Sequence, residues 1–134
     1  MNNSIDAKMF ASPGGKKRIL FVDDEDLFGS MGSRMLERQG YQVTFTSDCE
    51  AALQQFAYQP GDYDLVITGQ TLAHMTGTEL SDELLKIRPD IPIVLCTADE
   101  NFTKEEASRR GFREFMTKPL DSEIFTTKIR NILG

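Results

Sequence analysis

The chain has 134 residues, of which 40% are hydrophobic, and one domain of that size can bury a core without disulfides or a structural metal. Its formal charge of −6 argues against nucleic-acid binding, because phosphate contacts need a surplus of lysine and arginine. No apolar run approaches the ~20 residues of a membrane span, and the first residues lack the apolar centre of a signal peptide, so we expect a cytoplasmic protein. Cys49 and Cys96 have no metal-ligand spacing and are interpreted as reduced thiols.

Residues 1–17 are polar and rich in asparagine, serine, glycine and lysine, which predicts a disordered extension, either a linker or an added segment. From residue 18 to residue 134, strand and helix patterns alternate without an internal repeat. This alternation is typical of a parallel sheet covered by helices, and it predicts one (βα)5 domain over 18–134.

The runs that predict strands are, in chain order, 19–22, 41–46, 65–67, 91–95 and 114–117. The first, third and fourth are almost continuously apolar, as in central strands buried on both faces. The second alternates strictly between apolar and polar residues, and the fifth is short and only partly apolar, so we assign them to the edges. The expected fold class is α/β, a doubly wound sheet in the order 2-1-3-4-5 with helices on both faces.

Four of the helices between these strands show apolar residues at helical spacing. The predicted stripes are Leu27/Met31/Met35, Cys49/Ala52/Leu53/Phe56, Leu80/Leu84/Ile87 and Phe125/Ile129/Ile132. The remaining helix, 104–110, is short and polar and is expected to be the loosest. Capping boxes are predicted at Ser47 with Glu50 and at Thr103 with Glu106.

In a doubly wound sheet, ligands bind beyond the carboxyl ends of the strands, where the winding reverses. The residues expected there are Asp23, Asp24, Gly69, Thr97, Ala98 and Lys118, the last followed by Pro119. Two adjacent carboxylates suit Mg²⁺, a hard cation that takes one or two carboxylates with water and phosphate oxygens. A lysine and a hydroxyl at neighbouring strand ends suit the oxygens of a phosphoryl group.

This set of residues, in this order, resembles the receiver domain of bacterial two-component response regulators, and the resemblance covers residues 16–134. The stretches RPDIPIVLCTA and GFREFMTKPLDSEI are similar to receivers attached to hybrid histidine kinases. The resemblance implies a Mg²⁺ site at Asp23, Asp24 and the backbone of Thr71. It also implies phosphoryl contacts at Thr97, Ala98 and Lys118, and a switch aromatic at Phe115.

The family carries its phosphoacceptor aspartate at the position of Gly69, within a segment that reads GQTLAHMTG in this chain. Met75 and Gly77 of the family pattern are kept, while the acceptor and a proline are replaced. A glycine has no side chain, so it cannot form an acyl phosphate. We therefore expect no aspartate phosphorylation, weak Mg²⁺ binding and no required cofactor. His74, in the same segment, is interpreted as a loop residue.

The favoured hypothesis is a receiver-like domain that is not an enzyme and acts by phosphorylation-independent protein binding. Expected partners are a histidine kinase, its output domain or a second copy bound through the fourth helix, fifth strand and fifth helix; no nucleic-acid or membrane partner is expected. One alternative is a substitute acceptor such as Thr68. Another is a Mg²⁺-dependent phosphotransfer enzyme using Asp23 and Asp24, although the sequence offers it no nucleophile. Taken alone, Asp23 and Asp24 would also fit a helix N-terminus.

Overall fold

The computed structural model describes residues 15–134, so all but the end of the predicted extension over 1–17 lies outside the described residues. The described part contains five strands and five α-helices in strict alternation. The strands are β1 (Arg18–Val22), β2 (Gln42–Thr46), β3 (Leu65–Gly69), β4 (Ile93–Thr97) and β5 (Glu114–Thr117). The helices are α2 (Asp26–Arg38), α3 (Cys49–Tyr58), α4 (Gly77–Ile87), α5 (Lys104–Arg109) and α6 (Ser122–Leu133), with a short 3₁₀ turn, η2 (Pro60–Asp62), after α3.

The five strands form one parallel sheet in the order β2-β1-β3-β4-β5, which confirms the predicted fold class and strand order. The fourth strand differs from its predicted bounds, since it runs Ile93–Thr97 instead of 91–95. The carbonyl of Pro92 accepts a hydrogen bond from Val66, so the chain approaches β3 just before β4 begins. Gly69 is the last residue of β3 and pairs with Cys96 of β4.

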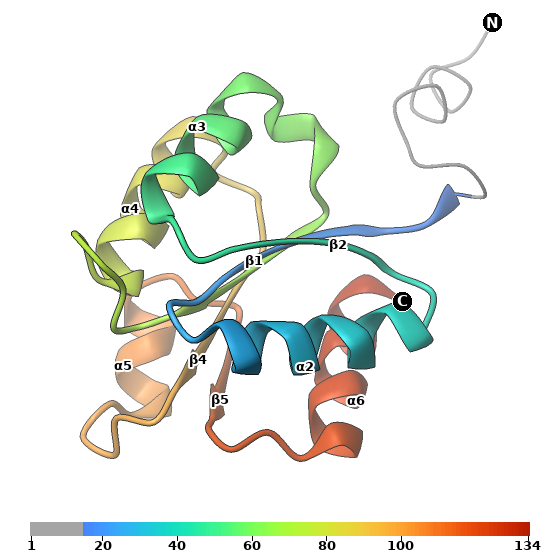
Figure 1. Ribbon diagram of the computed structural model, residues 1–134. Coiled ribbons are helices and arrows are strands. Elements are labelled where there is room, and N and C mark those ends of the chain that lie inside the picture. The colour runs from blue at the N-terminus through green and yellow to red at the C-terminus, as the bar shows by residue number, and fades with distance from the viewer. Residues whose placement is uncertain (1–14) are drawn as a thin grey trace, which may run out of the picture.

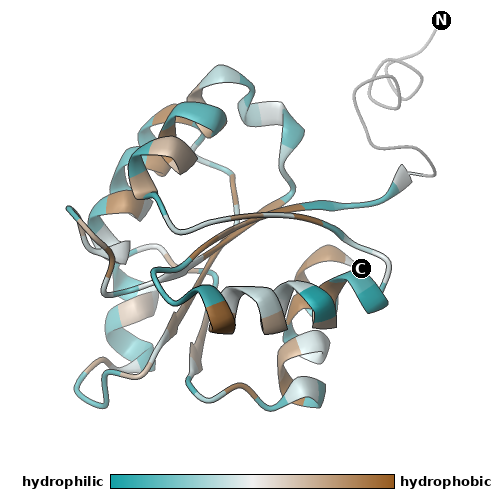
Figure 2. Cartoon of the chain, viewed as in Figure 1, coloured by the Kyte–Doolittle hydropathy of each residue, from teal (hydrophilic) through white to brown (hydrophobic). Residues whose placement is uncertain are grey.

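The helices cover the sheet in two layers, with α3, α4 and α5 on one face and α2 and α6 on the other (Figure 1). Because side chains alternate along a strand, β1 contributes side chains to the core on both faces of the sheet. Leu20 and Val22 lie in the core under α3, α4 and α5, while Ile19 and Phe21 lie in the core under α2 and α6. Figure 2 shows the resulting apolar sheet between helices that carry both hydrophobic and hydrophilic residues. No helix among the described residues is long and apolar enough to cross a membrane.

The buried face of α2 differs from the predicted one. Leu27 and Met31 of the predicted stripe are 74% and 52% exposed, and only Met35 packs against the core; the buried residues are Gly29, Gly32 and Leu36. The physical reason is that two aromatic rings rise from the sheet to the helix backbone. A Cβ at Gly32 would lie 2.6 Å from the ring of Phe21, and one at Gly29 would overlap the ring of Phe45. Small residues therefore mark the packed face of this helix.

The N-terminal caps of α3, α4 and α5 agree only in part with the predicted capping boxes. The N-cap of α3 is Asp48, whose side chain accepts from the backbone of Glu50 and Ala51, so the box predicted at Ser47 is wrong. Thr103 does cap α5. A complete capping box at the start of α4, between Thr76 and Glu79, was not predicted.

Candidate functional site

The carboxyl ends of β1, β3, β4 and β5 surround a hollow of about 370 Å³. It brings together most of the predicted site residues, because parallel strands end at the same edge of the sheet. The lining residues are Asp24, Glu25, Gln70, Thr71, Cys96, Thr97, Ala98, Asp99 and Lys118. We call this hollow the strand-end pocket. Glu25, Gln70, Cys96 and Asp99 were not predicted as site residues, although Glu25 belongs to the acidic run DDED that follows β1.

Asp23 is fully buried directly beneath the pocket. Its Oδ1 accepts a hydrogen bond of 2.9 Å from the backbone of Glu25, and its Oδ2 lies 3.0 Å from the Lys118 Nζ. The directed hydrogen bond from Lys118 goes to Oδ1, at 3.3 Å, so Oδ2 gains charge attraction without a hydrogen bond of its own. Burial raises the pKa of Asp23, although the Glu25 amide and Lys118 both favour the carboxylate. The N-cap residue of α2 is Glu25, which argues against reading Asp23 and Asp24 as that helix's cap.

Lys118 follows β5 and reaches back to the turn between β1 and α2. Its Nζ lies 2.6 Å from the Oε1 of Glu25 and 4.2 Å from the ring centroid of Phe28. Burial lowers the pKa of Lys118, but hydrogen bonds to Glu25 and Asp23 outweigh that effect and raise it. The lysine is therefore held in its charged form by two carboxylates and one aromatic ring.

Gly69 ends β3 next to Asp23. A Cβ placed on Gly69 would lie 2.8 Å from the Asp23 Oδ2 and 3.7 Å from the Leu72 Cδ2. The Asp23 carboxylate therefore lies where a side chain at position 69 would begin. Gly77 has a different role: a Cβ added there would overlap the Gly69 carbonyl oxygen, so only glycine allows α4 to start this close to β3.

Thr97 and Thr68 differ in their access to the pocket. The Thr97 hydroxyl accepts a 3.0 Å hydrogen bond from the backbone of Asp99 at the pocket wall. The Thr68 hydroxyl is fully buried and donates to the carbonyl of Gly69 at 2.8 Å. The contacts of Thr68 thus lie within the sheet.

Asp23, Asp24 and Glu25 each offer a carboxylate oxygen, and these oxygens lie within 4.8 Å of one another. Carboxylate oxygens are suitable donors for Mg²⁺, which takes one or two of them together with water. Two of the three are already ion-paired with Lys118, so a metal ion would have to compete with its ammonium group. The residues fit the metal by type, and the lysine limits how strongly they can hold it.

Phe115 lies away from the strand-end pocket, on the surface formed by α5, β5 and α6. Its ring stacks on Phe102, with ring centroids 5.9 Å apart and planes inclined by 26°. A second hollow, of about 290 Å³, lies beside it and is lined by residues that include Lys104, Ile124 and Lys128. The Lys128 Nζ donates to the carbonyl of Phe115 at 3.2 Å.

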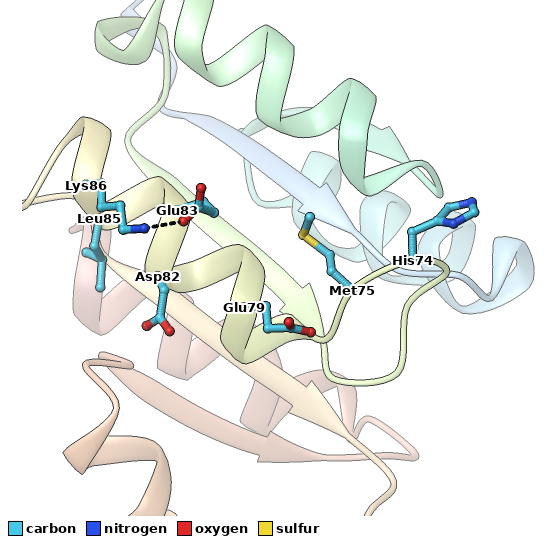
Figure 3. A pocket seen from close by; sticks show the side chains of 7 residues that line it. All are labelled: His74, Met75, Glu79, Asp82, Glu83, Leu85 and Lys86. Atoms are coloured by element: carbon cyan, nitrogen blue, oxygen red, sulfur yellow. Dashed lines mark hydrogen bonds and ion pairs between the residues drawn. The ribbon is translucent and has the colours of Figure 1, made fainter.

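A larger hollow, of about 680 Å³, lies along α4 and the loop before it (Figure 3). Its charged lining consists mainly of acids at helical spacing, and Glu83 pairs with Lys86 at 2.7 Å. His74 lies at its edge in the loop, as predicted, with a φ of 76°. The chemistry-bearing residues gather in the smaller strand-end pocket, which we therefore take as the candidate site.

Comparison with known proteins agrees with this geometry. The chain is 33% identical over 118 residues to the alkaline phosphatase synthesis transcriptional regulatory protein PhoP of Bacillus subtilis, covering 87% of this chain and 48% of that protein. It is 35% identical over 115 residues to the aerobic respiration control sensor protein ArcB of Escherichia coli, covering 84% of this chain and 14% of that protein. The chain thus spans less than half of each of these relatives.

A solved structure, the non-phosphorylated HemR receiver domain from Leptospira biflexa, superposes with a TM-score of 0.78 at 26% identity, covering 89% of this chain and 95% of that one. A CheY-like response regulator receiver domain protein from Methanospirillum hungatei gives a TM-score of 0.78 at 25% identity, covering 87% and 92%. The family description "response regulator receiver domain" matches residues 19–130. With the strand order, the strand-end residues and the matched range in agreement, the chain belongs to the response regulator receiver domain family.

Proposed function

We propose that this chain is a receiver domain of two-component signalling that has lost aspartate phosphorylation and acts by binding other proteins. The observation that carries the proposal is Gly69 at the end of β3, where the family's acceptor aspartate would stand. The space in front of Gly69 is taken by the Asp23 carboxylate. The pocket keeps the lysine, the threonine and the acids of a phosphorylation site but has no side chain at the position that reacts.

The geometry disfavours the two alternatives. Thr68 is an unsuitable acceptor because its hydroxyl is buried and donates to the Gly69 carbonyl. A phosphotransfer enzyme would need an activated nucleophile at the pocket wall. Burial raises the pKa of the Cys96 thiol to about 12, so it stays protonated and unreactive near neutral pH. We assign the chain no catalytic activity.

The surface of α5, β5 and α6 is the proposed binding face. It combines the aromatic ring of Phe115 with Ile124, an apolar side chain that is 56% exposed, and with two lysines. An exposed apolar residue with charges at its rim is typical of protein-binding surfaces. A histidine kinase, its output domain and a second copy of this chain are the proposed partners.

Intact mass spectrometry after incubation with acetyl phosphate and Mg²⁺ tests the loss of phosphorylation. We expect no mass change in the wild type and the gain of one phosphate in Gly69→Asp, because Asp24, Thr97 and Lys118 remain around the restored carboxylate. Gly69→Asn is the matched control, since it has the size of aspartate without a nucleophilic oxygen, and it should stay unmodified.

One outcome would contradict the proposal, and a second would show that Gly69 alone does not explain the loss. A phosphate gained by the wild type would show that another residue accepts the group. An unmodified Gly69→Asp under saturating donor would show that position 69 is not the sole defect of the pocket. The binding face is tested separately by sedimentation velocity, in which Ile124→Glu should dissociate a wild-type dimer; a wild type that stays monomeric at every concentration excludes the second copy as the partner.

A further inference from the structure

The Lys118 ammonium group is enclosed on three sides. The Oε1 of Glu25 lies 2.6 Å from its Nζ, the Oδ2 of Asp23 lies 3.0 Å away, and the ring centroid of Phe28 lies 4.2 Å away. Only 14% of the lysine side chain is exposed. Such a cage fixes the position of the charge more closely than a surface ion pair does, because surface pairs remain hydrated and mobile.

The cage depends on Gly69. Its missing side chain leaves space that the buried Asp23 carboxylate enters, within 2.8 Å of where a Cβ would stand. A larger residue at position 69 would push Asp23 out of this place, away from its present contact with Lys118. The absence of a side chain in β3 is therefore coupled to the position of a lysine that follows β5.

The same carboxylates form the acidic cluster that suits a metal ion. Asp23, Asp24 and Glu25 carry three negative charges within reach of one cation, and Lys118 supplies that cation from within the chain. An ammonium group and Mg²⁺ cannot share the oxygens of Asp23 and Glu25 at contact distance, because two cations that close repel each other.

We propose that Lys118 is the resident cation of this acidic cluster, in place of a divalent metal, with Asp23 and Glu25 as its counter-ions. This inference rests on the proposed function, since a domain that is not phosphorylated has no need of a metal to guide a phosphoryl group. The Lys118 backbone also donates to the Thr97 carbonyl at 3.0 Å. The side chain and the backbone of Lys118 together hold the turn between β5 and α6 against the ends of β1 and β4. These contacts require neither a metal ion nor a phosphoryl group.

Metal affinity measured by isothermal titration with Mn²⁺ tests this inference. In Lys118→Met the apolar stem remains and the charge is removed, so we expect Mn²⁺ to bind at least tenfold more tightly than in the wild type. Lys86→Met is the matched control, because Lys86 pairs with the exposed Glu83 on α4 and should leave the affinity unchanged. An unchanged affinity in Lys118→Met would refute the inference.

A second measurement uses the wild type and does not depend on a variant folding. The caged Lys118 amine should be acetylated by an amine-reactive reagent at least tenfold more slowly than the exposed Lys86 amine. Saturating Mn²⁺ should displace Lys118 from the carboxylates and abolish most of that difference. Equal rates without metal, or a difference that metal leaves unchanged, would contradict the inference. Phosphorylation of the wild type in the mass experiment would contradict the proposed function instead, so the two failures are distinguishable.

Discussion

Replacement of Gly77 by alanine tests the close approach of α4 to β3. The added Cβ would overlap the Gly69 carbonyl oxygen and lie 3.0 Å from the Gly69 carbonyl carbon and 3.1 Å from the Gln70 Cα. All three are backbone atoms, so relief requires movement of the strand end or of the helix. Overpacking of this kind costs about 1–3 kcal/mol, and loss of the 2.8 Å hydrogen bond from the Gly77 amide to the Gln70 carbonyl adds about 1 kcal/mol.

Against this cost stands the lower chain entropy of unfolded alanine, which favours the variant by about 0.4–1 kcal/mol. The balance is a loss of about 2–3 kcal/mol in the free energy of unfolding. For a domain of this size, that loss lowers the melting temperature by about 10 °C. Urea and thermal unfolding followed by circular dichroism measure both quantities.

Gly61→Ala is the matched control for this experiment. A Cβ at Gly61 meets no atom within 4 Å, and its φ lies outside the left-handed region. Because only the entropy of the unfolded chain changes, we expect this control to be as stable as the wild type or more stable by up to about 1 kcal/mol. If Gly77→Ala is no less stable than Gly61→Ala, the steric account of Gly77 is wrong.

Three further predictions concern the core, alkaline pH and metal. Leu36→Ala should cost about 2–5 kcal/mol in urea unfolding because Leu36 is fully buried, while Leu27→Ala should change stability by less than about 0.5 kcal/mol; equal losses would refute the buried face assigned to α2. The thiol of Cys96 has a pKa of about 12 in the folded protein and 9.0 ordinarily. Below pH 9 the thiol is protonated in both states and the folded protein keeps its full stability. As the pH rises from 9 through 12 the unfolded thiol ionises first, so the free energy of unfolding falls. Urea unfolding should therefore show a loss of about 1 kcal/mol between pH 8 and pH 10 that Cys96→Ala removes, and an equal loss in the variant would contradict it. Millimolar Mg²⁺ should raise the melting temperature only slightly, because Lys118 already pairs with two of the three carboxylates; a steep rise would count against that competition.

The sheet was predictable because its signal is carried by residues close together in sequence. Apolar runs, the alternating pattern of β2 and the positions of the strand ends together led to the correct strand order. The gathering of Asp24, Thr97 and Lys118 around one pocket followed from that order, since residues at the ends of parallel strands share one edge.

Features that depend on contacts between distant segments were not predictable in the same way. The predicted face of α2 rested on the helical spacing of large apolar residues. The face that packs carries Gly32 and Gly29 instead, because the rings of Phe21 and Phe45 leave no space for a side chain at these positions. The pairing of Glu25 with Lys118 joins residues 93 positions apart. No local pattern shows that Asp23 would lean into the space left by Gly69.

The glycines of α2 have a consequence for the charge balance of the pocket. Because their small size lets the helix lie close against the sheet, its first turn brings the ring of Phe28 over the Lys118 ammonium group. The distance between α2 and the sheet thereby determines how well the charge of Lys118 is shielded from water. Gly29 contacts the ring of Phe45 and does not line the pocket. A larger residue at position 29 would nevertheless move α2 away from the sheet, and with it the ring of Phe28, so that the Lys118 ammonium group in the pocket would be more exposed to water.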